Sequence, residues 1–215
     1  MIGRPNVGKS TLINKLIGEK IAITSPVAQT TRKKLKGILT TKNSQIIFID
    51  TPGIHKPHHL LGQRLVKSAK SSISGVDLTL LLFDSSNKPG KGDEYVKDFL
   101  ISNKSNFIAV LNKWDLVEDD KKKIRENQYK ALFQNKLIPF HPISAQTGEG
   151  CIELINLVEN HLPYGPLLYP KEMVSDQRKE LLFSDLIREQ VLLNTREEVP
   201  HSVAVKIEKI QEIKK

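Results

Sequence analysis

The chain has 215 residues, of which 39% are hydrophobic and 27% charged, and this near-average composition disfavours disordered, collagen-like and coiled-coil proteins. Its formal net charge of +9 allows a polyanionic partner such as RNA, since basic surfaces gain by releasing counterions from phosphates. The single cysteine, Cys151, excludes a disulfide framework and no apolar run approaches the roughly 18 residues of a membrane span, so we expect a cytoplasmic protein.

Short apolar runs alternate with polar helical stretches through the first two thirds of the chain, which is typical of βαβ units around a mostly parallel sheet. The runs predict strands over Leu35–Thr41, Gln45–Asp50, Asp77–Phe83, Asn106–Leu111 and Leu137–Ile143, and the first two are expected to form a hairpin. The intervening stretches predict helices over Ser10–Gly18, Leu61–Ile73, Asp93–Ser102, Lys121–Gln134 and Cys151–His161.

Three prolines and a glycine interrupt every periodic pattern between Leu162 and Pro170, so a domain boundary is expected there. We divide the chain into a first domain, 1–162, a linker, 163–175, and the start of a second domain, 176–215. In this second part Asp176 is predicted to cap a helix that runs to about Asn194, and Ser202–Ile207 alternates as a strand.

The eight residues from Gly3 to Ser10 match the P-loop pattern GxxxxGK[ST]. Glycines at both ends allow backbone N–H groups to converge on phosphate oxygens, while Lys9 supplies charge and the Ser10 hydroxyl ligates Mg²⁺ at a helix N-terminus. The nucleotide-binding residues predicted here are Gly3, Asn6, Val7, Gly8, Lys9, Ser10 and Thr11.

The sequence Asp-Thr-Pro-Gly from Asp50 to Gly53 ends an apolar strand. At that place a carboxylate can reach Mg²⁺ through water, and the Gly53 N–H can approach the γ-phosphate. The pattern is weak alone, but its position after a P-loop strengthens it.

The sequence Asn-Lys-Trp-Asp from Asn112 to Asp115 also follows a predicted strand. A carboxylate at Asp115 can accept both the N1–H and the 2-amino group of guanine, a pair of donors that adenine lacks. With Asn112, Lys113 and the later Ser144 and Ala145, whose loop offers a backbone amide to the guanine carbonyl, this pattern indicates a GTP site rather than an ATP site.

These motifs, together with AQTTR at 28–32 and TPGIHKP at 51–57, resemble the Era family of bacterial GTPases. The resemblance implies an α/β P-loop GTPase fold with a mostly parallel sheet flanked by helices, followed by an α+β KH-type (type II) RNA-binding domain. It also implies that 28–34 is switch I, with Thr30 or Thr31 meeting Mg²⁺, and that Asp50–Leu61 is switch II. The metal ligands are then Ser10, Thr31 and Asp50, with the choice between the two threonines left open.

Both ends are expected to be cut relative to that family. Met1 and Ile2 leave no room for the apolar strand that leads into the P-loop, so this strand is expected to be missing and to leave a gap between Gln45–Asp50 and Asp77–Phe83. The chain also ends before the GxxG loop with which KH domains clamp nucleic acid. We therefore expect a piece of a longer protein, with a truncated KH domain.

The resemblance implies a GTP-hydrolysing switch that binds 16S ribosomal RNA and assists assembly of the 30S ribosomal subunit. GTP or GDP and Mg²⁺ are the implied ligands. The implied protein is a monomer without a DNA partner, and a peripheral inner-membrane fraction is left open.

The residues expected to act in hydrolysis are Lys9, Thr30, Thr31 and Gly53. Ile54 stands where Ras-like enzymes place the glutamine that orients the attacking water, so slow intrinsic turnover is expected. Asn6 is similar to a P-loop asparagine that helps to hold an activating K⁺ in related GTPases, and a purely loop-stabilising role is the alternative.

Two other functions compete with this interpretation. One is a nucleotide-independent RNA-binding assembly factor with a vestigial GTP site, against which the intact Lys9, Ser10, Asp50, Asn112 and Asp115 argue. The other is a related GTPase of tRNA modification or large-subunit assembly, against which the AQTTR and HKP sequences and the KH-like tail argue.

Overall fold

A computed structural model describes residues 1–25, 34–54, 73, 75–134, 138–195 and 203–211. Its centre is a parallel sheet in the order β1-β4-β5-β6, made of β1 (Ile2–Gly3), β4 (Thr79–Asp84), β5 (Phe107–Asn112) and β6 (Phe140–Pro142). An antiparallel hairpin stands beside it, made of β2 (Leu35–Thr40) and β3 (Gln45–Asp50). All the predicted strands of the first domain are therefore present, although β6 is reduced to three residues around Pro142.

The first strand is short but present. Ile2 and Gly3 pair with Leu81 and Leu82, at a position where the sequence led us to expect no strand. Among the described residues no strand pairing joins the β2–β3 hairpin to the parallel sheet, but the expected gap beside β4 is wrong, because β1 lies there and the Met1 ammonium donates to the Ile49 carbonyl at 2.7 Å. The Thr51 hydroxyl, which donates to the Met1 carbonyl at 2.8 Å, connects the two sides.

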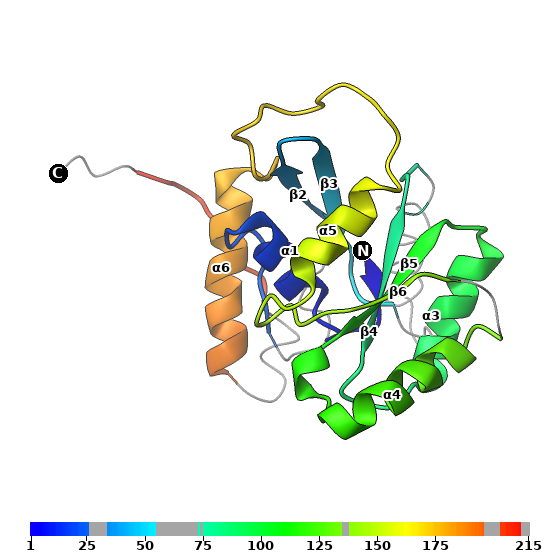
Figure 1. Cartoon of the computed structure of the whole chain (residues 1–215). Coiled ribbons are helices and arrows are strands. Elements are labelled where there is room, and N and C mark those ends of the chain that lie inside the picture. The colour runs from blue at the N-terminus through cyan, green and yellow to red at the C-terminus, as the bar shows by residue number, and fades with distance from the viewer. Residues whose placement is uncertain (26–33, 55–72, 74, 135–137, 196–202, 212–215) are drawn as a thin grey trace.

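Helices cover both faces of the parallel sheet (Figure 1). On one face α1 (Lys9–Ile17) and α5 (Cys151–Glu159) pack on alternate residues of β4 and β5, namely Leu80, Leu82, Ile108 and Val110. On the other face α3 (Lys91–Ser102) and α4 (Asp119–Ala131) pack on the residues between them, Leu81, Phe83, Ala109 and Leu111. This alternation follows from the two-residue period of a strand that is buried on both sides.

The four predicted helices of the first domain that the structure describes begin and end within three residues of their expected bounds. The predicted helix over 61–73 lies outside the described residues except for Ile73. Leu137, the first residue of the last predicted strand, also lies outside them. No described helix has the length and apolarity that crossing a membrane requires.

The segment predicted to be a linker lies along the hairpin. The Gln45 side chain accepts the N–H groups of Leu168 and Tyr169 at 2.9 Å each, and donates to the Tyr169 carbonyl at 3.0 Å. Further along, the Ile38 N–H donates to the Val174 carbonyl at 2.8 Å. The linker is therefore attached to β2 and β3 by backbone and side-chain hydrogen bonds.

The helix of the second part, α6 (Lys179–Asn194), begins two residues later than expected. The prediction that Asp176 caps it is wrong, because Asp176 forms an ion pair with Lys36 at 3.0 Å and Arg178 occupies the cap position without a side-chain cap. The predicted strand Ser202–Ile207 is also wrong over 203–207, which has no partner strand among the described residues.

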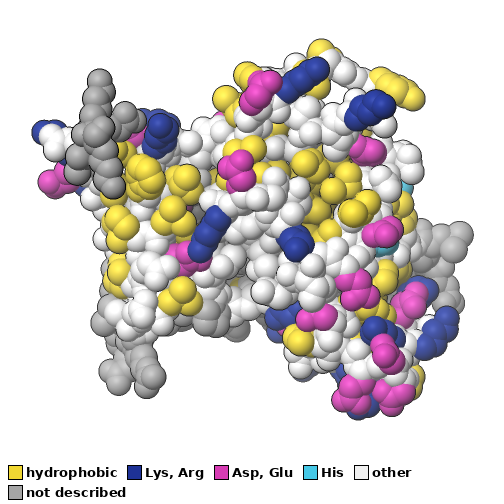
Figure 2. Space-filling view, turned by 60° about the vertical axis from the view of Figure 1, so that its left-hand side comes forward, with side chains coloured by type: hydrophobic (Ala, Val, Ile, Leu, Met, Phe, Trp, Pro, Cys, Tyr) yellow, Lys and Arg dark blue, Asp and Glu magenta, His cyan; other side chains and the backbone are white. Residues whose placement is uncertain are grey.

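The exposed side of α6 is unusually apolar. Figure 2 shows hydrophobic side chains gathered on this helix, and Phe183, Ile187 and Leu193 are 40%, 47% and 50% exposed. Its buried side instead contains charged residues, Arg188 and Glu189, whose side chains lie toward the first domain. The buried side of the helix therefore combines these charged groups with the apolar Leu192, while Phe183, Ile187 and Leu193 remain in solvent.

Candidate nucleotide-binding site

The loop between β1 and α1 has the backbone that the P-loop pattern predicts. Gly8 adopts a left-handed conformation with φ of 94° immediately before α1 begins at Lys9, and Asn6 is left-handed as well with φ of 63°. A Cβ added at Gly8 would lie 2.2 Å from the Asn112 side-chain nitrogen. A side chain at position 8 is therefore excluded both by the backbone conformation and by close packing.

Lys9 is buried at the mouth of this loop, with 6% of its surface exposed. Its ammonium donates to the carbonyl oxygens of Arg4 at 2.9 Å and of Gly3 at 3.4 Å. Burial lowers the pKa of Lys9 to about 8, although the charge of Asp50 opposes this shift. A phosphate bound at the loop would favour the charged form of Lys9, because an opposite charge stabilises an ammonium inside a protein.

Asp50 and Ser10 meet next to Lys9. The Ser10 hydroxyl donates to Oδ2 of Asp50 at 2.7 Å, while Oδ1 is buried without a hydrogen bond from a described residue. Burial raises the pKa of the Asp50 carboxyl, and Lys9 and the Ser10 hydrogen bond oppose that shift. A fully buried carboxylate with an unsatisfied oxygen is suited to a cation, since buried charges are costly unless they are paired or coordinate a metal.

The residues after Asp50 pack directly on the P-loop. A Cβ added at Gly53 would lie 2.5 Å from the Pro5 nitrogen, and the Ile54 N–H donates to the Gly3 carbonyl at 2.9 Å. The Ile54 side chain is 1% exposed and belongs to the core cluster on the α3 and α4 side of the sheet. In this position an isoleucine neither reaches solvent nor offers a polar atom to a water molecule.

Asn112 joins the P-loop to the later loop that is predicted to recognise guanine. Its side-chain Nδ2 donates to the Val7 carbonyl at 2.7 Å, and its Oδ1 accepts the Ala145 N–H at 2.9 Å. Asn112 is 2% exposed, so both hydrogen bonds lie inside the protein. One side chain thus fixes the spacing between the two loops predicted to hold opposite ends of a nucleotide.

Replacing Asn112 by alanine is expected to lower the free energy of unfolding by about 2 to 4 kcal/mol, because a buried carbonyl and a buried N–H lose their partners. Thermal unfolding followed by circular dichroism should show the midpoint falling by roughly 5 to 15 °C. Asn156→Ala, at an exposed position of α5, is the matched control and should unfold with the parent. An unchanged midpoint for Asn112→Ala would show that the bridge is not structurally important.

The base-recognition motif lies at the carboxyl end of β5. Trp114 is 8% exposed and packs in the core, and its backbone N–H donates to the Ile143 carbonyl at 3.0 Å. Asp115 follows on a short 3-10 turn with an exposed side chain. The buried tryptophan therefore holds the turn in place while the carboxylate remains available to a ligand.

Ser144 and Ala145 are both buried directly after β6. The Ser144 carbonyl accepts the Gly148 N–H at 2.8 Å, and its hydroxyl accepts the Thr147 N–H at 3.1 Å. These bonds close the loop in which an amide was expected to meet the guanine carbonyl. Because the Ala145 N–H already donates to Asn112, a guanine oxygen would have to share that donor or use a neighbouring amide.

Two residues of the site, Asp84 and Ser85, were not predicted from the sequence; they contact the predicted Lys113 and Asn112. Lys113 adopts a left-handed backbone, and its ammonium pairs with Asp84 Oδ2 at 2.6 Å. The hydroxyl of the buried Ser85 donates to the Asn112 carbonyl at 2.6 Å. Both follow the apolar run of β4, and the carboxyl ends of neighbouring parallel strands share one edge of the sheet, which was the signal that could have identified them.

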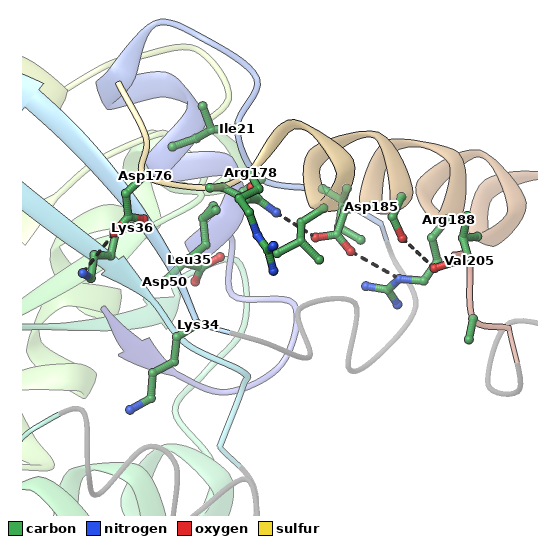
Figure 3. A pocket seen from close by; sticks show the side chains of 16 residues that line it. Ile21, Lys34, Leu35, Lys36, Asp50, Asp176, Arg178, Asp185, Arg188 and Val205 are labelled. Carbon is green, nitrogen blue, oxygen red and sulfur yellow. Dashed lines mark hydrogen bonds and ion pairs between the residues drawn. The ribbon is translucent and has the colours of Figure 1, made fainter. Parts of the chain in front are cut away.

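A cavity of about 380 Å³ lies between this site and α6 (Figure 3). Asp50 lies at one side of it, and Lys34, Leu35 and Lys36 lead away along β2. Arg178, Asp185 and Arg188 line the opposite side. The cavity places the candidate metal ligand Asp50 beside a helix that is more than 120 residues away in the chain.

The predicted catalytic and metal-binding Thr30 and Thr31, with most of switch I, lie outside the described residues, as does switch II beyond Ile54. The other predicted site residues converge at one edge of the sheet: Gly3, Asn6, Val7, Gly8, Lys9, Ser10 and Thr11 in and after the P-loop, Asp50 and Gly53 beside it, and Asn112, Lys113, Asp115, Ser144 and Ala145 at the base-recognition loops.

Comparisons with known proteins agree with this geometry. A family described as 50S ribosome-binding GTPase matches residues 1–113. GTPase Era of Crocosphaera subtropica is 53% identical over 212 residues, which are 99% of this chain and 67% of that protein. The chain belongs to the Era family of GTPases. GTPase Era of Synechocystis, 51% identical over the same share of both chains, supports the same assignment.

Solved Era structures show the same fold. Era in complex with MgGDPNP and nucleotides 1506–1542 of 16S ribosomal RNA superposes with a TM-score of 0.90 at 38% identity, over 98% of this chain and 71% of that one. An Era variant from Aquifex aeolicus bound to GDP·AlF4⁻ gives 0.89 at 36% identity, over the same shares. The chain thus spans about two thirds of the length of its curated Era relatives, and the predicted Era resemblance is confirmed.

Proposed function

We propose that this GTPase binds GTP with Mg²⁺ at the described site, hydrolyses it slowly, and uses the nucleotide state to control binding to 16S ribosomal RNA during 30S assembly. The observation that carries the nucleotide part is the Asn112 bridge, which sets the P-loop and the base-recognition loop at a fixed separation. The RNA part is supported by the Era relative whose structure contains nucleotides of 16S ribosomal RNA. We further propose that the protein is a monomer, that it acts in the cytoplasm and that it has no DNA partner.

The oxygen atoms at the site fit Mg²⁺. The Ser10 hydroxyl and the Asp50 carboxylate are hard oxygen ligands, the type that Mg²⁺ prefers, and Asp50 Oδ1 is buried without a hydrogen bond from any residue that the structure describes. We propose that Ser10 and Asp50 hold the ion, with Thr31 from switch I. Bound Mg²⁺ would neutralise phosphate charge, while Lys9 and the P-loop amides position the phosphates.

A physical connection between the site and the C-terminal helix supports a switch. Glu189 of α6 is 1% exposed, and its Oε1 accepts the Thr24 N–H at 2.8 Å and the Thr24 hydroxyl at 3.1 Å. Lys20 pairs with its other oxygen at 2.5 Å. Thr24 lies four residues before the predicted switch I, so the position of α6 depends on the segment that leads into that switch.

We propose that residues 176–215 open a KH-type (type II) domain. The exposed Phe183, Ile187 and Leu193 of α6 support this, because a KH domain would cover such side chains.

RNA binding by the full-length protein tests the proposal. A fluorescent RNA with the sequence of nucleotides 1506–1542 of 16S ribosomal RNA is expected to bind at least about fivefold more tightly with a non-hydrolysable GTP analogue than with GDP, as measured by anisotropy. A shuffled RNA, a tRNA and a large-subunit RNA fragment are the controls. Equal affinity in both nucleotide states would favour the nucleotide-independent RNA-binding factor, and preference for a control RNA would favour the related GTPases.

We also propose that Asn6 helps to hold an activating K⁺. Its left-handed backbone at the outer turn of the P-loop is compatible with this role. GTP turnover should then be faster in K⁺ than in Na⁺ buffer at equal ionic strength, and equal rates would leave Asn6 with a loop-stabilising role only.

A further inference from the structure

The P-loop is attached to neighbouring elements through the contacts described above and through one more that belongs to no recognised GTPase motif. At its C-terminal end Val7 is held by Asn112, as described above. At its N-terminal end the Arg4 guanidinium reaches α3, where Nη1 donates to Asp93 Oδ2 at 2.9 Å. The P-loop pattern itself requires neither an arginine at position 4 nor an acid on α3, so the Arg4–Asp93 pair lies outside that motif.

The surroundings of Asp93 fix its carboxylate in a position that suits the Arg4 guanidinium. Its side chain is 2% exposed, and the same Oδ2 also accepts the Gly90 N–H at 2.9 Å, so the carboxylate is fixed in the first turn of α3. Gly92 leaves the room that the arginine needs, because a Cβ there would lie 2.9 Å from Arg4 Nε. A buried carboxylate that is oriented by a backbone amide and paired with a guanidinium is a rigid anchor.

Arg4 in turn contacts the catalytic lysine through its backbone. Its carbonyl oxygen accepts a hydrogen bond from the Lys9 ammonium at 2.9 Å. The next residue, Pro5, packs against Gly53. A shift of Arg4 would therefore move the carbonyl that holds Lys9 and the surface on which Gly53 rests. The guanidinium itself is engaged with α3, so it acts on the loop and not on a ligand.

We propose that Asp93 is a positioning residue for nucleotide binding, which holds the P-loop through Arg4 in the conformation that grips phosphate. This inference rests on the proposed nucleotide site. Loss of the pair leaves the loop amides in place but allows them to move, and preorganised donors bind more tightly than mobile ones. The effect should appear in the rate at which nucleotide leaves.

The test is the dissociation rate of fluorescently labelled GDP from the full-length protein, measured by stopped flow. Asp93→Asn keeps the shape of the side chain and an acceptor for Gly90 but removes the charge, and should speed dissociation roughly tenfold. Asp98→Asn, on the same helix with a 68% exposed side chain, is the matched control and should dissociate at the parental rate.

A double-mutant cycle separates positioning from a general structural role. Arg4→Ala should speed dissociation as much as Asp93→Asn, and the double variant should be no faster than either single one, since the two side chains act as one unit. Arg4→Lys, which keeps the charge but loses the planar fork, should give an intermediate rate. The preference for guanine over xanthine nucleotides should stay unchanged in all of them, because Asp115 is untouched.

The outcomes are distinguishable. If the parental protein fails to bind labelled GDP, the proposed nucleotide site itself is wrong. If the parent binds but Asp93→Asn and Arg4→Ala dissociate within twofold of it, or their effects multiply in the double variant, the positioning role is overturned. Should Asp93→Asn fail to fold, the Arg4 variants decide the question, because that side chain is 44% exposed and its loss leaves the core intact.

Discussion

Replacing Asp115 by asparagine is expected to weaken GTP binding by about a hundredfold or more and to convert the protein into a xanthine-nucleotide binder. The exposed Asp115 carboxylate is available to accept two donors from guanine, and hydrogen bonds to a charged group contribute about 1.5 to 3 kcal/mol each. An asparagine amide would face the guanine donors with a donor of its own. Xanthine has a carbonyl where guanine has its amino group, so it accepts a hydrogen bond from that amide.

Competition between labelled GDP and unlabelled GTP or XTP in the full-length protein measures this change. Asp119→Asn is the matched control, because Asp119 is a second exposed aspartate four residues later whose carboxylate pairs with Lys122 on the surface of α4. The control should keep the parental preference. If Asp115→Asn also kept that preference, the guanine-recognition role of this motif would be disproved.

Replacing Lys9 by alanine is expected to reduce affinity for GTP and GDP by at least about a hundredfold. Lys9 is the buried ammonium of the P-loop, and among the described residues it donates hydrogen bonds to the carbonyls of Gly3 and Arg4. A bound triphosphate would supply an opposite charge in a site that excludes water, where charge-assisted hydrogen bonds are strongest.

The thermal stability of Lys9→Ala, unlike its affinity for nucleotide, should not fall. Burial lowers the pKa of Lys9 to about 8, so the protein around this ammonium disfavours its charge. Lys9→Ala should therefore unfold at a temperature equal to or above that of the nucleotide-free parent while it fails to retain labelled GDP. Lys42→Ala, at an exposed turn of the β2–β3 hairpin, is the control and should bind like the parent. Retention of nucleotide by Lys9→Ala would contradict the P-loop assignment.

The sequence was sufficient for most of the fold because its signals are local. Apolar runs such as those of β4 and β5 are buried on both faces, and strands of that composition between polar helical stretches leave few alternatives to a parallel sheet. The P-loop was equally clear, since Gly8 must adopt a conformation that other residues disfavour. Elements defined by such patterns were found within a few residues of their predicted bounds.

The errors concern side chains whose partners lie far away in the chain. Asp176 has the composition of a helix cap, but an ion pair with Lys36 satisfies it instead. The run after Ser202 alternates like a strand, yet a strand needs a neighbour, and the sequence shows no sign of which segment that would be. Glu189 lies within the helix predicted to run from Asp176 to Asn194, and its burial against Thr24 could not be foreseen without the fold.

The two faces of the parallel sheet have a consequence for how the family can diverge. Since neighbouring residues of β4 and β5 enter opposite cores, each layer of helices can exchange its side chains over generations without adjustment in the other. An inserted or deleted residue inside either strand would instead send every following side chain to the wrong face. Length variation among homologues should therefore be confined to the connections, and these two strands should keep a constant number of residues.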